Sequence, residues 1–290
     1  MNKYVIFTDS ACDISKATLE KWDVKCLNIT YRFDGESEDH TSDDTDIKTF
    51  YDKMRAGGTA KTAAINSYCF EEYFEEELKK GHDILYLGFS SGLSTTYNCS
   101  KMAVDELKEK YPERKIITVD SLSASAGQGL FVYLVAKEQE NGASIEDAAK
   151  FAKDLVPKTC AWFTVDDLEY LKRGGRISPT TAFVGNVLGI KPVLKINGEG
   201  KLISIEKARG RKSSLRALFD KYDESADNKT VGTVFISHAD CLEDAQKLAD
   251  MIKGKSGKAV DVITDIGPVI GAHTGPGCIA LFFVGNKDLC

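Results

Sequence analysis

A serine-rich segment holds the first residues of this chain that could do chemistry. The sequence Gly-Phe-Ser-Ser-Gly around Ser90 and Ser91 matches the G-x-S-x-G pattern of a nucleophile elbow, and it lies between an apolar run and a helical pattern, as such an elbow requires. A serine hydrolase would then use His273 as its base. Asp240 or Asp265 would supply the acid, which follows the serine in chain order. No His-Gly-Gly-Gly oxyanion motif precedes the serines.

The same segment is also suited to holding an anion. Ser94, Thr95 and Thr96 follow closely, so hydroxyl groups crowd at the start of a predicted helix. Backbone N–H groups are unpaired there and favour negative charge. We therefore rank anion binding first, helix capping alone second and nucleophilic catalysis third.

Two aspartates follow the first apolar run of the chain. Asp9 and Asp13 could hold Mg²⁺ for phosphoryl chemistry, because ligands collect at the carboxyl ends of parallel strands. The Asp-x-Asp pair of a haloacid-dehalogenase-type site is absent. Turn formation and N-capping of the next helix, by Asp13 or Ser15, is the stronger interpretation.

A basic, glycine-containing loop spans residues 171–179, Leu-Lys-Arg-Gly-Gly-Arg-Ile-Ser-Pro. The pattern predicts a helix that ends at the glycines and another that begins at Ser178, with Pro179 as its first residue. Its cations, which include Arg173 and Arg176, could grip a carboxylate or phosphate, dock an acidic partner, or lie on a solvated loop. A second basic set could share this face: Lys207, Arg209, Arg211 and Lys212.

His273 lies among turn-forming residues, between Gly267 and Gly277. A lone histidine is usually structural. The glycines would also let the backbone approach a ligand closely, and an imidazole can donate a hydrogen bond to a carboxylate. Structural and functional interpretations of this histidine are evenly matched.

Composition narrows the class of protein. The 290 residues are 42% hydrophobic and 28% charged, which is ordinary for a globular chain. The 38 Lys and Arg against 44 Asp and Glu give a net charge of −6, so nucleic acid is a poor candidate partner. There is no signal-peptide core and no apolar stretch of membrane-spanning length. We expect a cytoplasmic protein with no integral membrane association.

The eight cysteines form no C-x-x-C pair and no zinc-like spacing, so we expect no metal site. Several lie in apolar runs, as Cys160 and Cys278 do. We predict that these two are buried, reduced thiols in a reducing compartment.

Strand and helix patterns alternate along the first half of the chain, as in layered α/β proteins. Strands are predicted over 4–8, 24–33, 83–89 and 115–119, and helices over 14–22, 47–54, 67–80, 95–110, 126–139 and 145–155. After Pro157 the character changes. Strands are predicted over 160–165, 190–196, 202–205, 232–237, 260–263 and 279–284, and helices over 213–222 and 242–252, with a tight turn at Asn197-Gly198.

Length and these patterns predict either one large α/β domain or two lobes that divide near Pro157. Residues 1–158 would form a mostly parallel three-layer lobe, and residues 159–290 a lobe with a mixed or antiparallel sheet.

Taken in chain order, these segments resemble the DegV family, bacterial fatty-acid-binding proteins that serve as the lipid-carrying subunit of fatty acid kinase. The resemblance runs almost end to end and rests on these segments: Thr8-Asp9-Ser10, Lys61-Thr62, Ser90-Ser91-Gly92-Leu93-Ser94, Val119-Asp120-Ser121, Leu171 to Ile177, Lys191-Pro192 and the His273 turn. Each is a weak signal alone, but together they are specific.

The resemblance implies a long-chain fatty acid buried between two domains. Its carboxylate would be held by Thr62, Ser94 with Ser91 nearby, and His273, with Arg173 close by. Arg209, with its neighbours Arg176 and Arg211, would face the kinase. The chain would then be a carrier and not an enzyme, and it would use no cofactor, because ATP would bind to the catalytic subunit.

The chain departs from the family pattern at two places. Where the family has Ser-Gln-Pro-Ser after the threonine, this chain has Ala-Ile-Asn-Ser after Ala63. Where the family has Ser-Gly-Thr-Tyr-Gln, this chain has Ser-Thr-Thr-Tyr-Asn, which begins at Ser94. Both head-group residues, Thr62 and Ser94, are retained. Asn66 is expected to cap the next helix in place of the proline. An apolar stripe gives the candidates for the acyl tunnel: Phe183, Val184, Val187 and Leu188.

A fatty acid needs an apolar site for its acyl chain and hydrogen-bond partners for its carboxylate. Each buried CH₂ contributes about 0.8 kcal/mol, whereas the carboxylate must be fully hydrogen-bonded to leave water. Hydroxyl groups and His273 can supply those bonds. The main alternative is a serine hydrolase, and a third is an interaction module without lipid, in which the Ser and Gly clusters are only caps.

Overall fold

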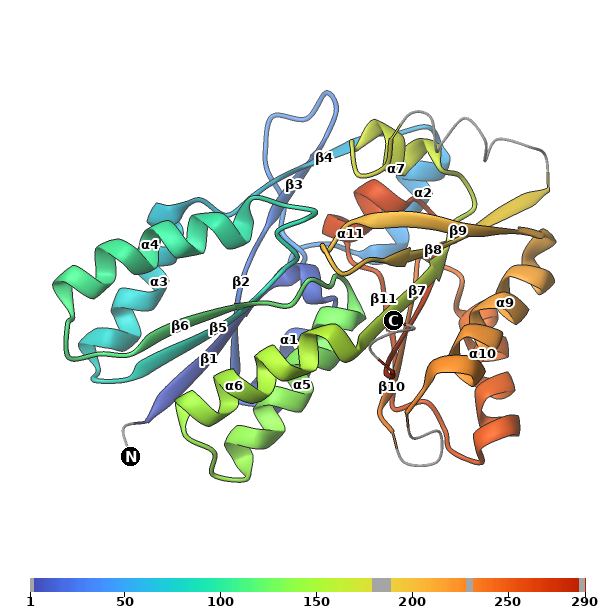
Figure 1. Cartoon of the computed structure of the whole chain (residues 1–290). Helices are drawn as coiled ribbons and strands as arrows, with labels where there is room; N and C mark the ends of the chain where they lie inside the picture. The colour runs from blue at the N-terminus through green and yellow to red at the C-terminus, as the bar shows by residue number, and fades with distance from the viewer. Residues whose placement is uncertain (1–2, 179–188, 228–231, 287–289) are drawn as a thin grey trace.

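Two β-sheets organise the chain, which a computed structural model describes at residues 3–178, 189–227, 232–286 and 290 (Figure 1). The first sheet is parallel, in the order β2-β1-β5-β6. Its strands are β1 (Tyr4–Asp9), β2 (Val24–Leu27), β5 (Asp83–Gly88) and β6 (Ile116–Asp120). The second sheet is mixed, in the order β11-β10-β12-β7-β8-β9, with only β10 and β11 parallel. Its strands are β7 (Thr159–Thr164), β8 (Ile190–Ile196), β9 (Leu202–Arg209), β10 (Val234–His238), β11 (Val262–Asp265) and β12 (Ile279–Val284).

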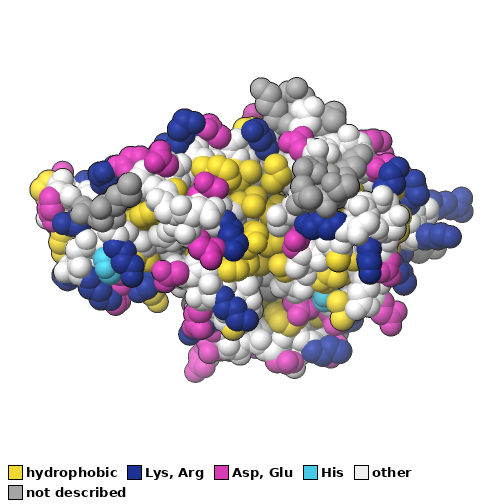
Figure 2. All heavy atoms as spheres, turned by 90° about the horizontal axis from the view of Figure 1, so that it is seen from below, with side chains coloured by type: hydrophobic (Ala, Val, Ile, Leu, Met, Phe, Trp, Pro, Cys, Tyr) yellow, Lys and Arg dark blue, Asp and Glu magenta, His cyan; other side chains and the backbone are white. Residues whose placement is uncertain are grey.

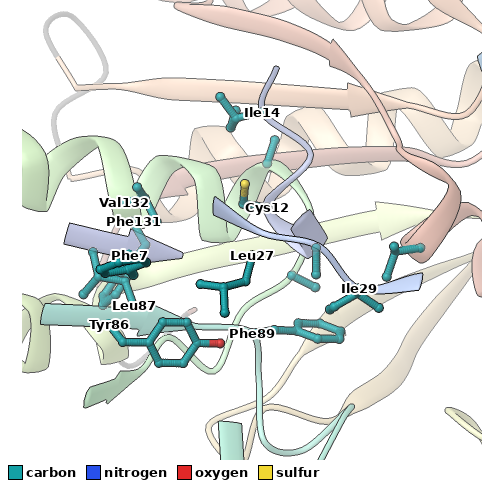
Figure 3. Close-up of a cluster of buried hydrophobic side chains, with 14 of the residues drawn as sticks. Phe7, Cys12, Ile14, Leu27, Ile29, Tyr86, Leu87, Phe89, Phe131 and Val132 are labelled. Carbon is teal, nitrogen blue, oxygen red and sulfur yellow. The ribbon is translucent and has the colours of Figure 1, made fainter. Parts of the chain in front are cut away.

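Helices cover both faces of the parallel sheet. α3 (Ser67–Lys79) and α4 (Thr96–Lys110) lie on one face, and α5 (Ala126–Glu140) and α6 (Ile145–Leu155) on the other (Figure 1). Every residue of β5 is buried, as expected for a strand that is covered on both sides. Figure 3 shows part of this core, with Phe7 of β1 close to Leu87 of β5. The prediction of a three-layer lobe is confirmed.

The mixed sheet is also covered on both faces. α9 (Gly210–Ser225) and α10 (Leu242–Ser256) pack on one face, around buried residues such as Leu218 and Leu248. On the other face, α5 packs against β7, β10 and β12, and Gly127 lies so close to the Phe282 ring that a Cβ there would be 2.5 Å from it. α5 therefore contacts both sheets. The domain boundary predicted after residue 158 stays a prediction.

A small two-stranded antiparallel sheet lies beside the parallel sheet. It pairs β3 (Thr30–Phe33) with β4 (Ala60–Ala63) and is followed along the chain by α3, whose first turn is capped by Asn66 as predicted. The sequence had predicted one extended segment over 24–33 and no strand at 60–63. The backbone instead changes sheet near Ile29, whose N–H donates to the Ser10 hydroxyl. The Ala-Lys-Thr-Ala strand carries too little β-branched or aromatic signal to be found from sequence.

The segment around His273 is a helix, α11 (Pro268–Thr274), and not the predicted turn. Pro268 occupies the first helical position, where a missing N–H costs nothing, and Gly275 ends the helix with φ of 72°. Gly271 inside it meets the Tyr51 ring, because a Cβ there would lie 2.5 Å from the Tyr51 hydroxyl. The glycines that suggested a loop are therefore needed for close packing.

Other helix boundaries follow the predicted signals. α1 (Lys16–Lys21) is capped by Ser15, and α2 (Ile47–Arg55) by Asp46. α7 (Glu169–Arg173) ends at Gly174, as predicted. The predicted helix from Ser178, with the tunnel candidates Phe183, Val184, Val187 and Leu188, lies outside the described residues. Two short 3₁₀ helices complete the described elements: η1 (Ser10–Cys12) and η2 (Val156–Lys158).

Cys160 and Cys290 form a disulfide, so the prediction of a reduced Cys160 is wrong. β7 and β12 are antiparallel, and the chain after β12 therefore returns to the start of β7, where the two Cα atoms lie 4.4 Å apart. Cys278 is a buried free thiol, as predicted.

Charged side chains surround an apolar region on one face of the molecule. Seen from below, hydrophobic side chains gather near the middle of the face, with Lys, Arg, Asp and Glu toward both ends (Figure 2). In the part of the chain that the structure describes, no helix combines the length and the apolar character needed to cross a membrane.

Candidate functional site

A cavity of about 440 Å³ lies between the two sheets. Its apolar wall comes from both halves of the chain and includes Ile29 and Phe89 from the first half and Phe163, Ile196, Leu202 and Phe282 from the second. Figure 3 shows Ile29 and Phe89 beside one another at one end of the buried core of the first half. The volume falls within the range of small-molecule sites, which are mostly apolar with a few placed polar groups.

Polar residues from distant parts of the sequence meet on the same cavity. Thr62, Ser91, Ser94 and His273 all line it, so the structure brings together four of the five residues predicted to surround a carboxylate. Arg173, the fifth, is exposed and does not line the cavity. Its guanidinium carbon lies 5.6 Å from the centre of the Tyr170 ring.

Arg176 lines the cavity instead, although the sequence placed it toward a partner. Its Nε donates to the Leu93 carbonyl at 3.1 Å, and its Nη1 donates to the Gly174 carbonyl. Burial lowers the pKa of Arg176, but a guanidinium keeps its charge at any physiological pH. A fixed cation therefore borders the cavity.

His273 is the centre of the polar wall. Its Nε2 lies 2.9 Å from the Thr62 hydroxyl, and its Nδ1 is buried without a hydrogen-bond partner among the described residues. Burial first, and then the charge of Arg176, lower the pKa of His273 to about 4. The imidazole is therefore neutral at pH 7 and can give or accept one hydrogen bond at each nitrogen, depending on its tautomer.

The Gly-Gly pair of the basic loop has a steric role at this histidine. A Cβ on Gly174 would lie 2.3 Å from Nδ1 of His273, so only glycine lets the α7 end pass this close. Gly175 has φ of 71°, which favours glycine for conformational reasons. The loop thus carries Arg176 to the cavity while leaving room for the imidazole.

The serines after β5 have different surroundings. Ser94 shares a 3.0 Å contact with the Thr96 hydroxyl and accepts the Thr96 N–H, at the start of α4. Ser91 is exposed, and its N–H donates to the Asp120 carboxylate at 3.2 Å. Both hydroxyls border the cavity without being committed to a catalytic pair.

The Gly-Phe-Ser-Ser-Gly segment docks the β8–β9 hairpin. Ser90 is fully buried and donates to the Gly200 carbonyl at 2.8 Å. A Cβ on Gly92 would lie 2.6 Å from the carbonyl oxygens of Glu199 and Gly200, which explains the glycine. The motif therefore joins the two halves of the chain beside the cavity.

The described residues assemble no serine triad. His273 contacts a threonine, and none of the described carboxylates bonds its Nδ1, whereas a triad requires one there. The two predicted acids are engaged elsewhere, Asp240 with Arg55 and Asp265 with His238.

Two further predicted groups lie away from the polar wall. Arg209 is exposed at the start of α9, whereas Arg211 pairs with Asp166 at 2.6 Å and donates to the Gly277 carbonyl. Asp9 is buried and accepts from the Tyr86 hydroxyl and two backbone N–H groups, which leaves no open face for Mg²⁺. The described residues contain no group of three metal-ligating side chains.

Sequence reasoning missed most of the apolar wall. Phe163 and Phe282 come from strands that read as ordinary buried core, and Ser125 lines the cavity from an unusual backbone conformation with φ of 54°. No local signal separates a cavity wall from a packed core, because both are apolar at the same spacing.

Comparison with known proteins agrees with this architecture. The model of the DegV family matches residues 3–286. The chain belongs to the DegV family. A DegV domain-containing protein of Clostridium perfringens is 46% identical over 288 residues, covering 99% of each chain.

Solved structures of the family share the whole fold. A DegV protein of Eubacterium eligens loaded with heptadecanoic acid is 26% identical, with a TM-score of 0.85 over 98% of this chain and 100% of its own. A stearic acid-binding protein of Eubacterium ventriosum is 26% identical, with a TM-score of 0.86 over 99% and 100%. Both of these structural neighbours bind a fatty acid.

His273 is expected to make the fold less stable in acid. Because its pKa falls from 6.5 to about 4 on folding, the unfolded chain binds this proton more readily, and stability is lost as pH falls through that interval. This group should remove up to about 3 kcal/mol from the free energy of unfolding between pH 7 and 4. Urea unfolding at a series of pH values should show that part of the slope disappear in His273→Gln.

A His40→Gln chain, changed at a partly exposed histidine, serves as the control and should keep the slope of the unchanged protein. Equal slopes for His273→Gln and the unchanged protein would contradict the buried, neutral imidazole.

Proposed function

We propose that this chain binds a long-chain fatty acid in the cavity, with the carboxylate beside Thr62, Ser94, His273 and Arg176. The observation that carries the proposal is a single cavity with an apolar wall and a contiguous polar wall that includes a cation. The fatty acids bound by DegV proteins of the same fold support it.

The energetics of this arrangement favour an amphipathic anion. An acyl chain gains about 0.8 kcal/mol for each methylene removed from water, so a long chain gains on the order of 10 kcal/mol. The carboxylate loses its hydration and needs replacement partners. Arg176 can supply charge, the hydroxyls of Thr62 and Ser94 can donate, and the neutral imidazole can add a further bond. Ser91 offers an exposed hydroxyl on the same cavity.

The first expected result is a co-purified lipid. Denaturing fresh protein, extracting it into organic solvent and analysing the extract by mass spectrometry should yield a fatty acid at close to one per chain. A thermal shift with a panel of fatty acids should then raise the unfolding temperature, because a ligand that binds only the folded state stabilises it. An empty extract together with no thermal shift would refute fatty-acid binding by this chain.

The two arginines of the basic loop give a matched test of the head-group position. Arg176→Gln removes the cation on the cavity and should weaken fatty-acid binding about 10- to 100-fold, the range for a hydrogen bond to a charged group. Arg173→Gln changes the exposed arginine three residues away and should leave affinity within about twofold. A fluorescent fatty-acid displacement assay measures both. Loss of binding in Arg173→Gln alone would place the carboxylate at the other arginine.

We also propose that the bound fatty acid is presented to a separate ATP-dependent kinase subunit and that the acyl phosphate stays on the carrier. Chemistry within this chain is not part of the proposal, since ATP would be held by the kinase. Arg209 is exposed and is the residue of the second basic set that we place toward the kinase. Arg211 supports that face from beneath through its pairs with Asp166 and Asp244.

Arg209→Ala should therefore separate transfer from binding. With a bacterial fatty acid kinase subunit and ATP, the KM for the loaded carrier should rise about tenfold, whereas fatty-acid affinity should not change. Ser213→Ala, an exposed change four residues away on α9, is the matched control. An unchanged KM in Arg209→Ala would remove this face from the kinase interface.

A further inference from the structure

The carboxylate of Asp13 ties several segments together at the start of the helix that carries His273. One oxygen accepts the Gly267 N–H at 2.9 Å, directly before α11. The other accepts the Ser125 hydroxyl, at the start of α5. The Asp13 carbonyl accepts the Thr264 hydroxyl at 2.9 Å, from β11. One buried residue of the first half thus holds three segments that meet beside the cavity.

The backbone around Asp13 is fitted to these contacts. Asp13 has φ of 51°, a left-handed conformation that aspartate tolerates better than most residues. A Cβ on Gly267 would lie 2.7 Å from the Asp13 carboxylate, so the close approach requires glycine. Ser125 lines the cavity and also contacts the Ser237 hydroxyl at 2.8 Å. A small shift of Asp13 would therefore move Ser125 and change the cavity wall.

A second contact holds the same point of the chain. The Tyr51 hydroxyl, from α2, donates to the Ile266 carbonyl at 2.7 Å. Ile266 and Gly267 lie directly before α11, and His273 is near its other end. A helix of two turns transmits a shift at one end to the other, because backbone hydrogen bonds join one turn to the next.

We propose that Asp13 is a positioning residue that fixes the start of α11 on the first half of the chain and so sets His273 against Thr62. The proposal rests on the proposed function of the cavity for its consequence in ligand binding. Asp13 does not line the cavity and does not touch the fatty acid in this scheme.

Asp13 positions α11 through its hydrogen bonds and not through its charge. Burial, with a smaller contribution from Asp265, raises the pKa of Asp13 to about 7, so both protonation states are populated near neutrality. The ionised form accepts both bonds. The protonated form can still accept the Gly267 N–H at one oxygen and donate to the Ser125 hydroxyl from the other. Asparagine offers the same pattern.

The other titratable groups near Asp13 do not replace these bonds. Asp265 of β11 pairs with His238 of β10 at 3.5 Å. Tyr51 of α2 and the Cys278 thiol are both buried, and burial raises the pKa of each, so they stay neutral. On the open side, the groove around Asp13 is bordered by charged side chains: Lys16, Glu20, Lys25, Asp43 and Glu76.

The test uses His273 itself as the reporter and needs no ligand. In Asp13→Ala, the loosened α11 should let water reach the imidazole, and the His273 pKa measured by NMR titration should rise by at least about one unit from 4 toward 6.5. Asp13→Asn should keep it near 4. Leu248→Ala, which removes a buried side chain from the distant core between α10 and the mixed sheet, should lower stability without moving the His273 pKa.

Gly267→Ala reaches the same contact from the other partner and covers the case in which Asp13→Ala does not fold. It should also raise the His273 pKa. Asp13 does not position His273 if the folded variants among Asp13→Ala and Gly267→Ala keep the His273 pKa of the unchanged protein. The same conclusion follows if Leu248→Ala raises that pKa as much as they do.

Ligand binding separates this proposal from the function of the cavity. Fatty-acid affinity should fall at least about tenfold in Asp13→Ala and recover in Asp13→Asn. If the unchanged protein binds no fatty acid, the proposed function fails, and the His273 titration still decides the role of Asp13.

Discussion

The contact between His273 and Thr62 is the interaction on which the candidate site depends. It joins residues 211 positions apart, one from a short helix of the second half and one from a two-stranded sheet of the first. A polar group can leave water only when it finds partners, and the partners that we propose for the carboxylate come from both halves. The docking of the halves is therefore also the assembly of the site, and the segments that fix it have a functional consequence without touching a ligand.

Glycine placement shows how closely the segments around the cavity approach one another. Gly174 makes room for the imidazole, and Gly92 makes room for the backbone of the β8–β9 hairpin. A Cβ at either position would come within 2.7 Å of another atom, well below normal contact. The basic loop with Gly174 suggests flexibility, and the Gly-Phe-Ser-Ser-Gly segment with Gly92 suggests a nucleophile elbow. Both segments instead pack closely against other parts of the chain, and their glycines make room for that packing.

The sequence predicts those parts of the fold whose signals lie in neighbouring residues. Alternating patterns and caps such as Ser15 and Asn66 depend on neighbouring residues, and the layers and most helix boundaries could be predicted from them. The α11 helix could not, because its proline and glycines indicate a turn unless the packing of Gly271 on Tyr51 is known. Family resemblance located Thr62, Ser94 and His273, whereas the exchange of Arg173 for Arg176 at the cavity depends on how the basic loop packs against Leu93, which no local pattern specifies.

The neutral state of His273 favours retention of a ligand over chemistry on it. A general base needs a pKa near the working pH, and a triad histidine needs a carboxylate to stabilise its protonated form. The pKa of His273 is lowered to about 4, first by burial and then by the cation of Arg176, which opposes protonation. That same pair suits a carboxylate, because Arg176 compensates the negative charge and the imidazole adds a hydrogen bond without adding charge. These features agree with the proposed role of the cavity, in which the carboxylate is held as an anion and the kinase supplies the groups that react with it.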